Sequence, residues 1–277
     1  MIVNPISTPL DIIILAGQSN AEGNGHGALL NEYVPTPEIL TLQGKCAQKV
    51  IKKAGEKDYL KLETEKTYYV DTAKERVSGQ TVFGNLALTF AEKYKESALE
   101  RGRKILIINT AVGGTGFARN HWGIGEVLFE RLMDMTSEAL NMNSQNRVVA
   151  LLWHQGEHDA YEFDHLTDVE REVFYREKIN LLFSRVRESF GKMPIICGKF
   201  ALPWERLYKS RCEAIYCATE NVCQTLGSAI LVETSDLTTN AYETGNGDDI
   251  HFSRKALYLL GERYYDAYDK ILKEKGK

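Results

Sequence analysis

Two short polar segments of the chain contain the side chains that nucleophilic catalysis requires. Ser19 follows the apolar run 12–16 and Gly17, and His251 lies in a polar loop three positions after Asp248. A serine hydroxyl becomes a nucleophile when a base takes its proton, and an imidazole titrates near neutral pH. A carboxylate can then hold the ring in one tautomer. We therefore interpret Ser19 as the nucleophile and His251 as the base, with Asp248 close enough in the loop to be the acid.

A third polar segment, residues 153–159, directly follows the apolar run 148–152. Its sequence is Trp-His-Gln-Gly-Glu-His-Asp, the densest group of polar side chains in the chain. Glu157 is a second carboxylate that could orient His251, so the residues alone leave Asp248 and Glu157 open as the acid.

A metal site is the alternative use of the same segment. His154, His158 and Asp159 have ligand side chains, and histidines four positions apart can share one face of a helix. Here they follow a strand directly and Gly156 stands between them, which favours a loop. We therefore expect no metal and no other cofactor.

The three polar segments need elements that bring them to one place. Apolar runs predict buried strands, and apolar residues at helical spacing predict amphipathic helices. The predicted strands are residues 12–16, 105–108, 148–152, 194–200 and 229–233, and the predicted helices are 84–98, 126–140, 167–189, 205–226 and the segment after Ser253. This alternation predicts a doubly wound parallel α/β sheet in one domain, residues 1–277. Ligands bind beyond the carboxyl ends of such strands, where all three polar segments would meet.

Residues 29–81 form the least regular part of the chain. Pro35 and Pro37 prevent a regular helix, and residues 45–66 are rich in lysine and glutamate. Alternating residues at 61–63 and 67–70 indicate short strands or a hairpin. We expect an irregular insertion that is either a rim of the substrate site or a solvated loop.

Composition excludes several other classes of protein. The 277 residues carry a formal net charge of −4, which argues against a basic nucleic-acid-binding surface. No apolar run approaches the roughly 20 residues that span a bilayer, and the N-terminus lacks a signal-peptide pattern. The five cysteines have no Cys-x-x-Cys spacing and fit reduced structural thiols. We expect a cytoplasmic protein, or a secreted one if a signal was removed before Met1.

Four motifs in order give the chain a resemblance to a known family. They are Gly17-Gln18-Ser19-Asn20, Ala111-Val112-Gly113-Gly114-Thr115, residues 153–159 and Asp248-Asp249-Ile250-His251. Together they resemble the SGNH hydrolases, and within them the branch of sialate O-acetylesterases and acetylxylan esterases. The resemblance extends from Asp11 to about Gly261.

The resemblance implies a three-layer α/β/α sandwich with a flavodoxin-like five-stranded parallel sheet and a metal-free serine esterase. It supports Ser19, His251 and Asp248 as the triad and leaves Glu157 as the alternative acid. It implies three oxyanion donors, which are the backbone N–H of Ser19, the backbone N–H of Gly84 and the side chain of Gln155. Asn85 stands where the branch often has proline and is an alternative donor. The implied substrate-binding residues are Gln18, Asn20, Gly113, Gly114 and Thr115.

The expected reaction is removal of O-acetyl groups from carbohydrates such as decorated xylan or O-acetylated sialic acid. The expected partner is therefore a small acetylated sugar, with no nucleic acid and no membrane, and the sequence does not indicate an oligomeric state. The alternatives are a lipase or thioesterase on the same fold and a non-catalytic carbohydrate-binding relative.

Overall fold

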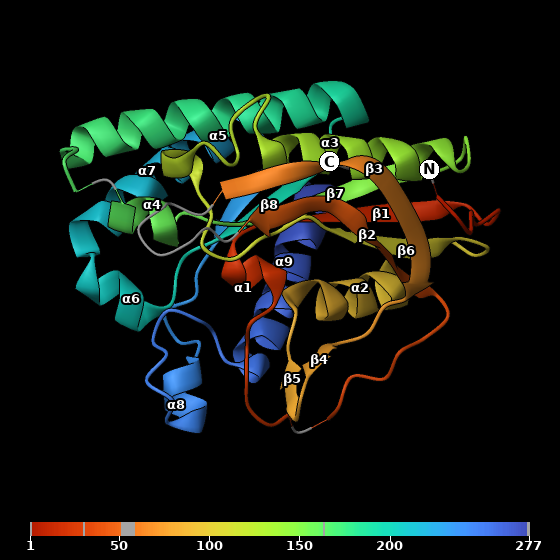
Figure 1. Ribbon diagram of the computed structural model, residues 1–277, viewed down its shortest axis with the longest axis horizontal. Coiled ribbons are helices and arrows are strands. Elements are labelled where there is room, and N and C mark those ends of the chain that lie inside the picture. Colours follow the sequence, from red (N-terminus) through yellow and green to blue (C-terminus); the bar gives the residue numbers. More distant parts are fainter. Residues whose placement is uncertain (1, 30, 51–58, 163, 276–277) are drawn as a thin grey trace.

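The structure is built around a seven-stranded sheet, and this computed structural model describes residues 2–29, 31–50, 59–162 and 164–275 (Figure 1). The side chains of residues 45–50, 59 and 62–65, Cys46 among them, lie outside the description. Across the sheet the strands are ordered β3-β2-β6-β1-β7-β8-β9. In that order they comprise Tyr59–Thr72, Ile39–Val50, Lys104–Asn109, Leu10–Gly17, Arg147–His154, Ile195–Gly198 and Ala229–Val232.

The parallel part of the sheet confirms the predicted fold class. Strands β6, β1, β7, β8 and β9 are the five expected strands, and each pairs in parallel with its neighbours. Numbered along the chain, their spatial order is 2-1-3-4-5, the flavodoxin-like order. The carboxyl end of β1 therefore lies at a switch point of the sheet, where α/β proteins bind ligands.

Helices cover both faces of the sheet (Figure 1). One layer contains α3 (Val127–Asn141), α5 (Asp168–Phe190) and α7 (Lys209–Leu226), and the other contains α2 (Leu86–Ser97) and α9 (Arg254–Lys275). A hydrophobic core lies between the sheet and each helix layer. Because side chains alternate between the two faces along β1, Ile12 and Ile14 lie in the core beneath the first layer and Ile13 and Leu15 in the core beneath the second. Every residue of β1 is buried, as expected for a strand covered on both sides.

Two of the predicted helices have boundaries that local contacts and dihedral angles explain. A capping box is present at the start of α5, where the Thr167 and Glu170 side chains each bond the other's backbone. The single helix predicted for residues 205–226 is instead two, α6 (Leu202–Leu207) and α7, because Tyr208 leaves the helical region with φ −124° and ψ 39°.

The expectation for residues 29–81 is wrong in part, because two strands of the main sheet lie in this segment. β2 pairs with β6 only over residues 39–41, and β3 pairs antiparallel with β2 along its length. Leu40 and Leu42 on β2 and Val70 on β3 are buried, so this end of the hairpin belongs to the core. Beyond the three residues paired with β6, β2 pairs only with β3, and this part of the hairpin is rich in lysine and glutamate. Its polar composition lacks the apolar run of a core strand, so the sequence did not reveal these strands as part of the main sheet.

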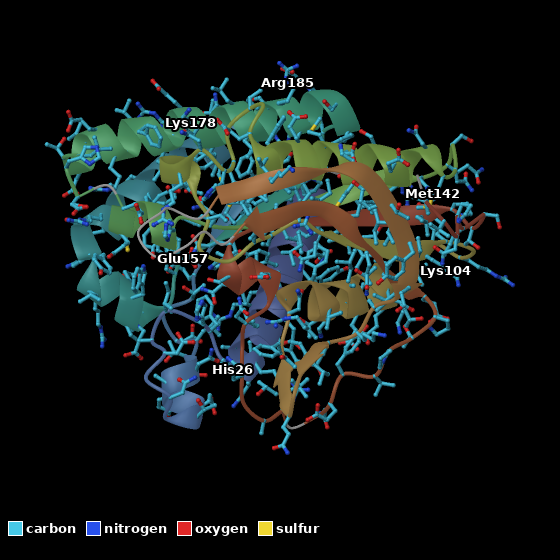
Figure 2. The ribbon with its side chains drawn as sticks, in the orientation of Figure 1. His26, Lys104, Met142, Glu157, Lys178 and Arg185 are labelled. Atoms are coloured by element: carbon cyan, nitrogen blue, oxygen red, sulfur yellow. The ribbon has the colours of Figure 1, made fainter. Side chains whose placement is uncertain are left out.

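Short elements collect at the carboxyl edge of the parallel strands. They are α1 (Ser19–Glu22), α4 (Glu157–Glu162), α8 (Asn240–Thr244), the 3₁₀ turn Phe117–Arg119 and the hairpin of β4 (Arg76–Ser78) and β5 (Thr81–Phe83). Figure 2 shows Glu157 among them, whereas Lys104 and Met142 lie at the opposite edge. All three predicted polar segments reach this edge.

A buried carboxylate anchors the other edge of β1. Asp11 is 0% exposed and accepts hydrogen bonds from Arg103 Nε at 2.8 Å, Arg147 Nε at 2.7 Å and the Tyr94 hydroxyl at 2.7 Å. These partners belong to or flank α2, β6 and β7, so one side chain fixes the central strand to its surroundings. A charge taken out of water in this way is stable only while its partners remain.

We expect Asp11→Ala to lower the free energy of unfolding by about 3 kcal/mol, because it removes the buried carboxylate that pairs with Arg103 and Arg147 and accepts the Tyr94 hydroxyl. Urea denaturation followed by circular dichroism measures the change. Asp269→Ala, which removes an exposed helical ion pair with Lys273, is the control and should change the same quantity by less than about 0.5 kcal/mol. Equal effects of the two substitutions would contradict this account of Asp11.

Candidate active site

Gly17 ends β1 with a backbone turn that places Ser19 at the carboxyl edge. Its φ is +133°, and a Cβ there would lie 2.0 Å from the backbone oxygen of His154. Only glycine fits such a contact and such a dihedral angle. The next residue, Gln18, donates its backbone N–H to the same His154 oxygen at 3.0 Å. Ser19 is then the first residue of α1.

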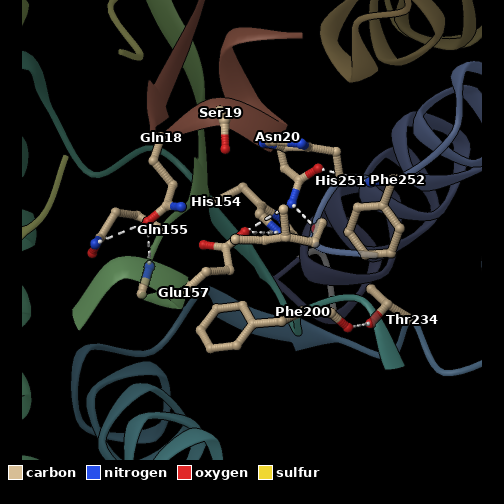
Figure 3. A network of polar contacts seen from close by, with 12 residues as sticks. Gln18, Ser19, Asn20, His154, Gln155, Glu157, Phe200, Thr234, His251 and Phe252 are labelled. Carbon is tan, nitrogen blue, oxygen red and sulfur yellow. Dashed lines mark hydrogen bonds and ion pairs between the residues drawn. The ribbon is translucent and has the colours of Figure 1, made fainter. Parts of the chain in front are cut away.

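The side chain of Asn20 brings the His251 loop to Ser19. Its Nδ2 donates to the backbone oxygen of Ile250 at 3.2 Å, and its Oδ1 accepts the backbone N–H of Phe252 at 3.0 Å. These two residues flank His251, so the neighbour of the serine in sequence binds both neighbours of the histidine (Figure 3). Asn20 is 0% exposed, and its predicted role in substrate binding is replaced by this structural one.

Asp248 and His251 form the contact expected of an orienting acid and a base. His251 Nδ1 lies 2.9 Å from Oδ1 and 2.8 Å from Oδ2 of Asp248. Because a carboxylate only accepts, the ring hydrogen resides on Nδ1 and leaves Nε2 as an acceptor. Burial acts to raise the pKa of Asp248, but hydrogen bonds from Asn240 and His251 outweigh it and hold that pKa below its usual value. The acid is therefore ionised wherever the imidazole can act as a base.

The Ser19 side chain lies close to the glycine-rich exit of β6. A Cβ on Gly113 would stand 3.4 Å from Ser19 Cβ, an ordinary van der Waals contact, and 2.9 Å from Glu22 Oε2, so a side chain there would displace the Glu22 carboxylate. No described residue hydrogen-bonds the Ser19 hydroxyl or accepts its backbone N–H. Figure 3 shows the hydroxyl directed into the space bordered by Gln18 and Asn20. Both groups are thus available to a substrate.

Glu157 is not placed to orient His251. It is 0% exposed, accepts from Asn20 Nδ2 at 2.8 Å through Oε1, and has His154 Nε2 at 3.5 Å from the same oxygen. Burial acts to raise the pKa of Glu157, but the contacts with His154 and Asn20 outweigh it and lower that pKa. The geometry therefore favours Asp248 as the acid and makes Glu157 a support for Asn20.

Two of the expected oxyanion donors, Gly84 and Gln155, already donate their hydrogens to protein acceptors in this structure. Gly84 N–H donates to the backbone oxygen of Gly25 at 2.9 Å. The Asn85 side chain accepts from Ala87 N–H at the start of α2 and donates to the Glu22 backbone oxygen at 3.3 Å, so it offers no replacement.

Gln155 is the other expected donor that the structure assigns elsewhere. Its Nε2 donates to Asp159 Oδ2 at 2.7 Å and makes longer contacts with the Thr115 backbone oxygen at 3.3 Å and Gln18 Oε1 at 3.4 Å. The Tyr175 hydroxyl fixes its oxygen from the other side at 3.0 Å. Gln155 therefore lies behind Gln18 as part of a buried network.

Gln18 has the side-chain amide that faces Ser19. Its Oε1 accepts the backbone N–H of His158 at 3.1 Å, which turns Nε2 toward the Ser19 hydroxyl (Figure 3). No described residue accepts from that Nε2.

Of the remaining predicted substrate contacts, Gly114 is exposed, whereas Thr115 is buried and bonds the Val112 backbone oxygen at 2.7 Å.

The candidate metal ligands are held by different protein partners. His154 Nδ1 bonds the Tyr264 hydroxyl at 3.0 Å, and Asp159 accepts the backbone N–H groups of Phe117 at 3.1 Å and Ala118 at 2.7 Å. The described residues contain no cluster of three such side chains suited to a metal ion.

Sequence reasoning missed Asn240, which is 0% exposed beside the triad. Its Nδ2 donates to Asp248 Oδ2 at 2.9 Å and to the Asn24 backbone oxygen at 3.0 Å, and its Oδ1 accepts His26 N–H at 2.7 Å. It lies in a polar stretch with no apolar periodicity, so no signal in a single sequence marked it.

The pKa of Asp159 gives a test of this buried network. Complete burial raises it from 3.8 to about 6, against the hydrogen bonds from Ala118, Gln155 and Phe117. Because the folded state then holds the proton more tightly than the unfolded state, the wild type should lose stability relative to Asp159→Asn as pH rises from 4 to 6.5. Between these two pH values the free energy of unfolding of the wild type should fall by about 2 kcal/mol relative to that of the variant. Urea titrations of both proteins across this range measure it, and a constant or opposite difference would contradict the burial of an ionisable Asp159.

Comparisons with known proteins agree with this architecture. A family model described as carbohydrate esterase, sialic acid-specific acetylesterase, matches residues 9–270. The crystal structure of NanS has a TM-score of 0.72 at 21% identity and covers 97% of this chain and 99% of that one. A protein from Arabidopsis thaliana has a TM-score of 0.68 at 22% identity, covering 95% and 98%. A carbohydrate acetylesterase from Xanthomonas citri has a TM-score of 0.55 at 16% identity, covering 94% and 56%. No curated protein sequence matches.

Proposed function

Because the chain belongs to the carbohydrate esterase family of sialic acid-specific acetylesterases, and is therefore a carboxylic ester hydrolase that deacetylates carbohydrates, we propose that Ser19, His251 and Asp248 perform its reaction. The observation that carries this assignment is the paired contact of Asp248 with His251 Nδ1, at 2.8 and 2.9 Å, on a loop bound to the segment of Ser19. This contact leaves one imidazole nitrogen to take the serine proton.

The proposed reaction has two acyl-transfer steps. His251 Nε2 accepts the proton of the Ser19 hydroxyl as Oγ bonds to the acetyl carbon, and the carbonyl electrons move to the oxyanion. The oxyanion collapses, the bond to the sugar oxygen breaks, and that oxygen leaves with the proton from His251. Water then gives its proton to the same nitrogen, attacks the acetyl-serine, and acetate departs as Ser19 regains its hydrogen.

Two donors support the oxyanion in this proposal. The Ser19 backbone N–H has no acceptor among the described residues, and Gln18 Nε2 faces the same space. Because His158 fixes the Gln18 oxygen at 3.1 Å, this amide is oriented before substrate arrives. Donors fixed in advance stabilise the developing charge at little reorganisation cost. Gln18 thus takes the role that the sequence suggested for Gln155.

The room beside the nucleophile supports a short acyl group. Gly113 approaches Ser19 without a side chain, and its N–H is held by Glu22 Oε2 at 2.9 Å. We propose that the methyl group of the acetyl ester lies beside this glycine. We propose acetyl specificity for this reason, in preference to the longer acyl chains of a lipase or thioesterase.

We also propose a single catalytic domain spanning residues 1–277 and a cytoplasmic location. Among the described cysteines, Cys197, Cys212 and Cys223 are buried and free and Cys217 is exposed and free, which suits a reducing compartment. No helix within the described part of the chain is long and apolar enough to cross a membrane.

Ser19→Ala should reduce acetate release from p-nitrophenyl acetate and from an acetylated sugar by at least about a thousandfold, because it removes the hydroxyl that forms the proposed acetyl-enzyme. Ser137→Ala on α3, whose hydroxyl bonds the Met133 backbone oxygen, is the matched control and should retain wild-type rates. A Ser19 variant that folds and keeps most of its activity would refute the assignment of the nucleophile. In the wild type, rates should fall as the acyl chain lengthens from acetyl to octanoyl, and a rise would favour a lipase.

Gln18→Ala should lower kcat for acetate release by about a hundredfold with a smaller effect on KM, because the amide contacts charge that develops in the transition state. Gln224→Ala, which removes an exposed amide on α7, serves as the control. If Gln155→Ala lowers kcat while Gln18→Ala does not, the donor is Gln155 and this part of the proposal fails.

A further inference from the structure

A buried pair of titratable side chains lies behind the Asn20 amide (Figure 3). His154 and Glu157 are both 0% exposed, and His154 Nε2 lies 3.5 Å from Glu157 Oε1. The same Glu157 oxygen accepts from Asn20 Nδ2 at 2.8 Å. Because Asn20 bonds the residues on either side of His251, the pair is one hydrogen bond away from the side chain that positions the base. The proposed acyl transfer uses neither member of the pair.

The hydroxyl of Tyr264 indicates which hydrogens the His154 ring carries. It donates its single hydrogen to the Trp153 backbone oxygen at 3.1 Å and also lies 3.0 Å from His154 Nδ1. With that hydrogen used, the hydroxyl can only accept from the ring, so Nδ1 carries a hydrogen. A ring with no second hydrogen would present a bare Nε2 to the Glu157 carboxylate, and two buried acceptors would face each other at a cost. A hydrogen between Nε2 and Glu157 removes this conflict.

The surroundings of Glu157 favour a charge on His154. The part of the chain that the structure describes offers Glu157 no lysine or arginine as an ion-pair partner. The titratable groups on which its charge acts are Asp159 on α4, Tyr175 on α5, Cys212 on α7 and Tyr264 on α9. Burial raises the pKa of each of these four groups, so none of them provides a positive charge. Burial also acts to raise the pKa of Glu157, but the contacts with His154 and Asn20 outweigh it, which places the shared hydrogen on the ring.

We infer that His154 is a positioning residue of the active site: its ring carries hydrogens on both nitrogens, and the resulting charge keeps Glu157 ionised behind Asn20. The inference rests on the proposed esterase activity. A hydrogen bond to an ionised carboxylate is stronger than one between neutral groups, so the charge on Glu157 fixes the Asn20 amide more firmly. Without the second hydrogen on His154, Glu157 would be a buried charge with no partner of opposite sign, which is strongly unfavourable.

The first measurement observes the two ring nitrogens of His154 directly. Selective ¹⁵N labelling of histidine and long-range ¹H–¹⁵N correlation spectra at neutral pH distinguish a protonated ring nitrogen from a bare one. We expect two protonated nitrogens on His154 in the wild type. After Glu157→Gln we expect one bare nitrogen, because the amide keeps an oxygen for Asn20 and needs no opposite charge. The spectrum of His154→Phe assigns the signals by their loss.

The second measurement is the pH dependence of kcat for p-nitrophenyl acetate. His154→Phe keeps a ring packed against Phe200 and Phe252 and removes the charge. Burial then raises the pKa of Glu157 without opposition from His154, so the carboxyl is neutral at low pH and an unpaired buried charge at high pH. The kcat of this variant relative to the wild type should therefore fall by at least about tenfold as pH rises from about 6 to about 9.

Combining His154→Phe with Glu157→Gln leaves no charge to bury, so the relative loss at high pH should disappear. His165→Phe, at an exposed histidine before α5, is the matched control and should follow the wild type at every pH. Asp159 titrates in all of these proteins, so its effect cancels in each ratio to the wild type.

Two results would overturn the inference: a bare ring nitrogen on His154 in the active wild type, or a loss in His154→Phe that is equal at every pH or survives in the double variant. The second result would show that His154 contributes packing alone. An inactive wild type refutes the esterase assignment whatever the spectrum shows, whereas an active enzyme with a bare nitrogen on His154 refutes only the inference about His154.

Discussion

The arrangement at the carboxyl edge depends on the side chain of Asn20. It bonds both neighbours of His251 across a separation of 230 residues or more and is itself held by the buried carboxylate of Glu157. A buried amide of this kind has to satisfy both its donor and its acceptor groups, so it specifies one position for each partner. The nucleophile and the base therefore occupy neighbouring positions because their adjacent residues share one set of hydrogen bonds.

Hydrogen bonds and close backbone contacts also fix the positions of Asp248 and Ser19. Asn240 fixes the acid at 2.9 Å, and Gly17 allows β1 to turn against the His154 backbone. On the other side, Asn24 connects the Ser19 backbone to Arg76. The hydrogen bonds of Asn24 thus fix the loop that leaves α1 relative to the nucleophile.

Much of this arrangement could be predicted from the sequence, and the failures have identifiable physical causes. The five core strands and the approach of Asp248 to His251 follow from apolar runs and local spacing, and the structure confirms both. The edge strands in residues 29–81 were missed because their polar ends extend beyond the core. Gly84 and Gln155 were misjudged as donors because their acceptors lie in other segments, which a single sequence cannot pair with them.

The most direct test of the central claim is covalent labelling with a fluorophosphonate, read by peptide mass spectrometry. If the Asn20 contacts bring His251 to Ser19, the reagent should modify the peptide that contains Ser19, and Asn20→Ala should label far more slowly. Active enzyme that takes up no label, that is labelled on another residue, or that labels equally fast without Asn20 would contradict the account.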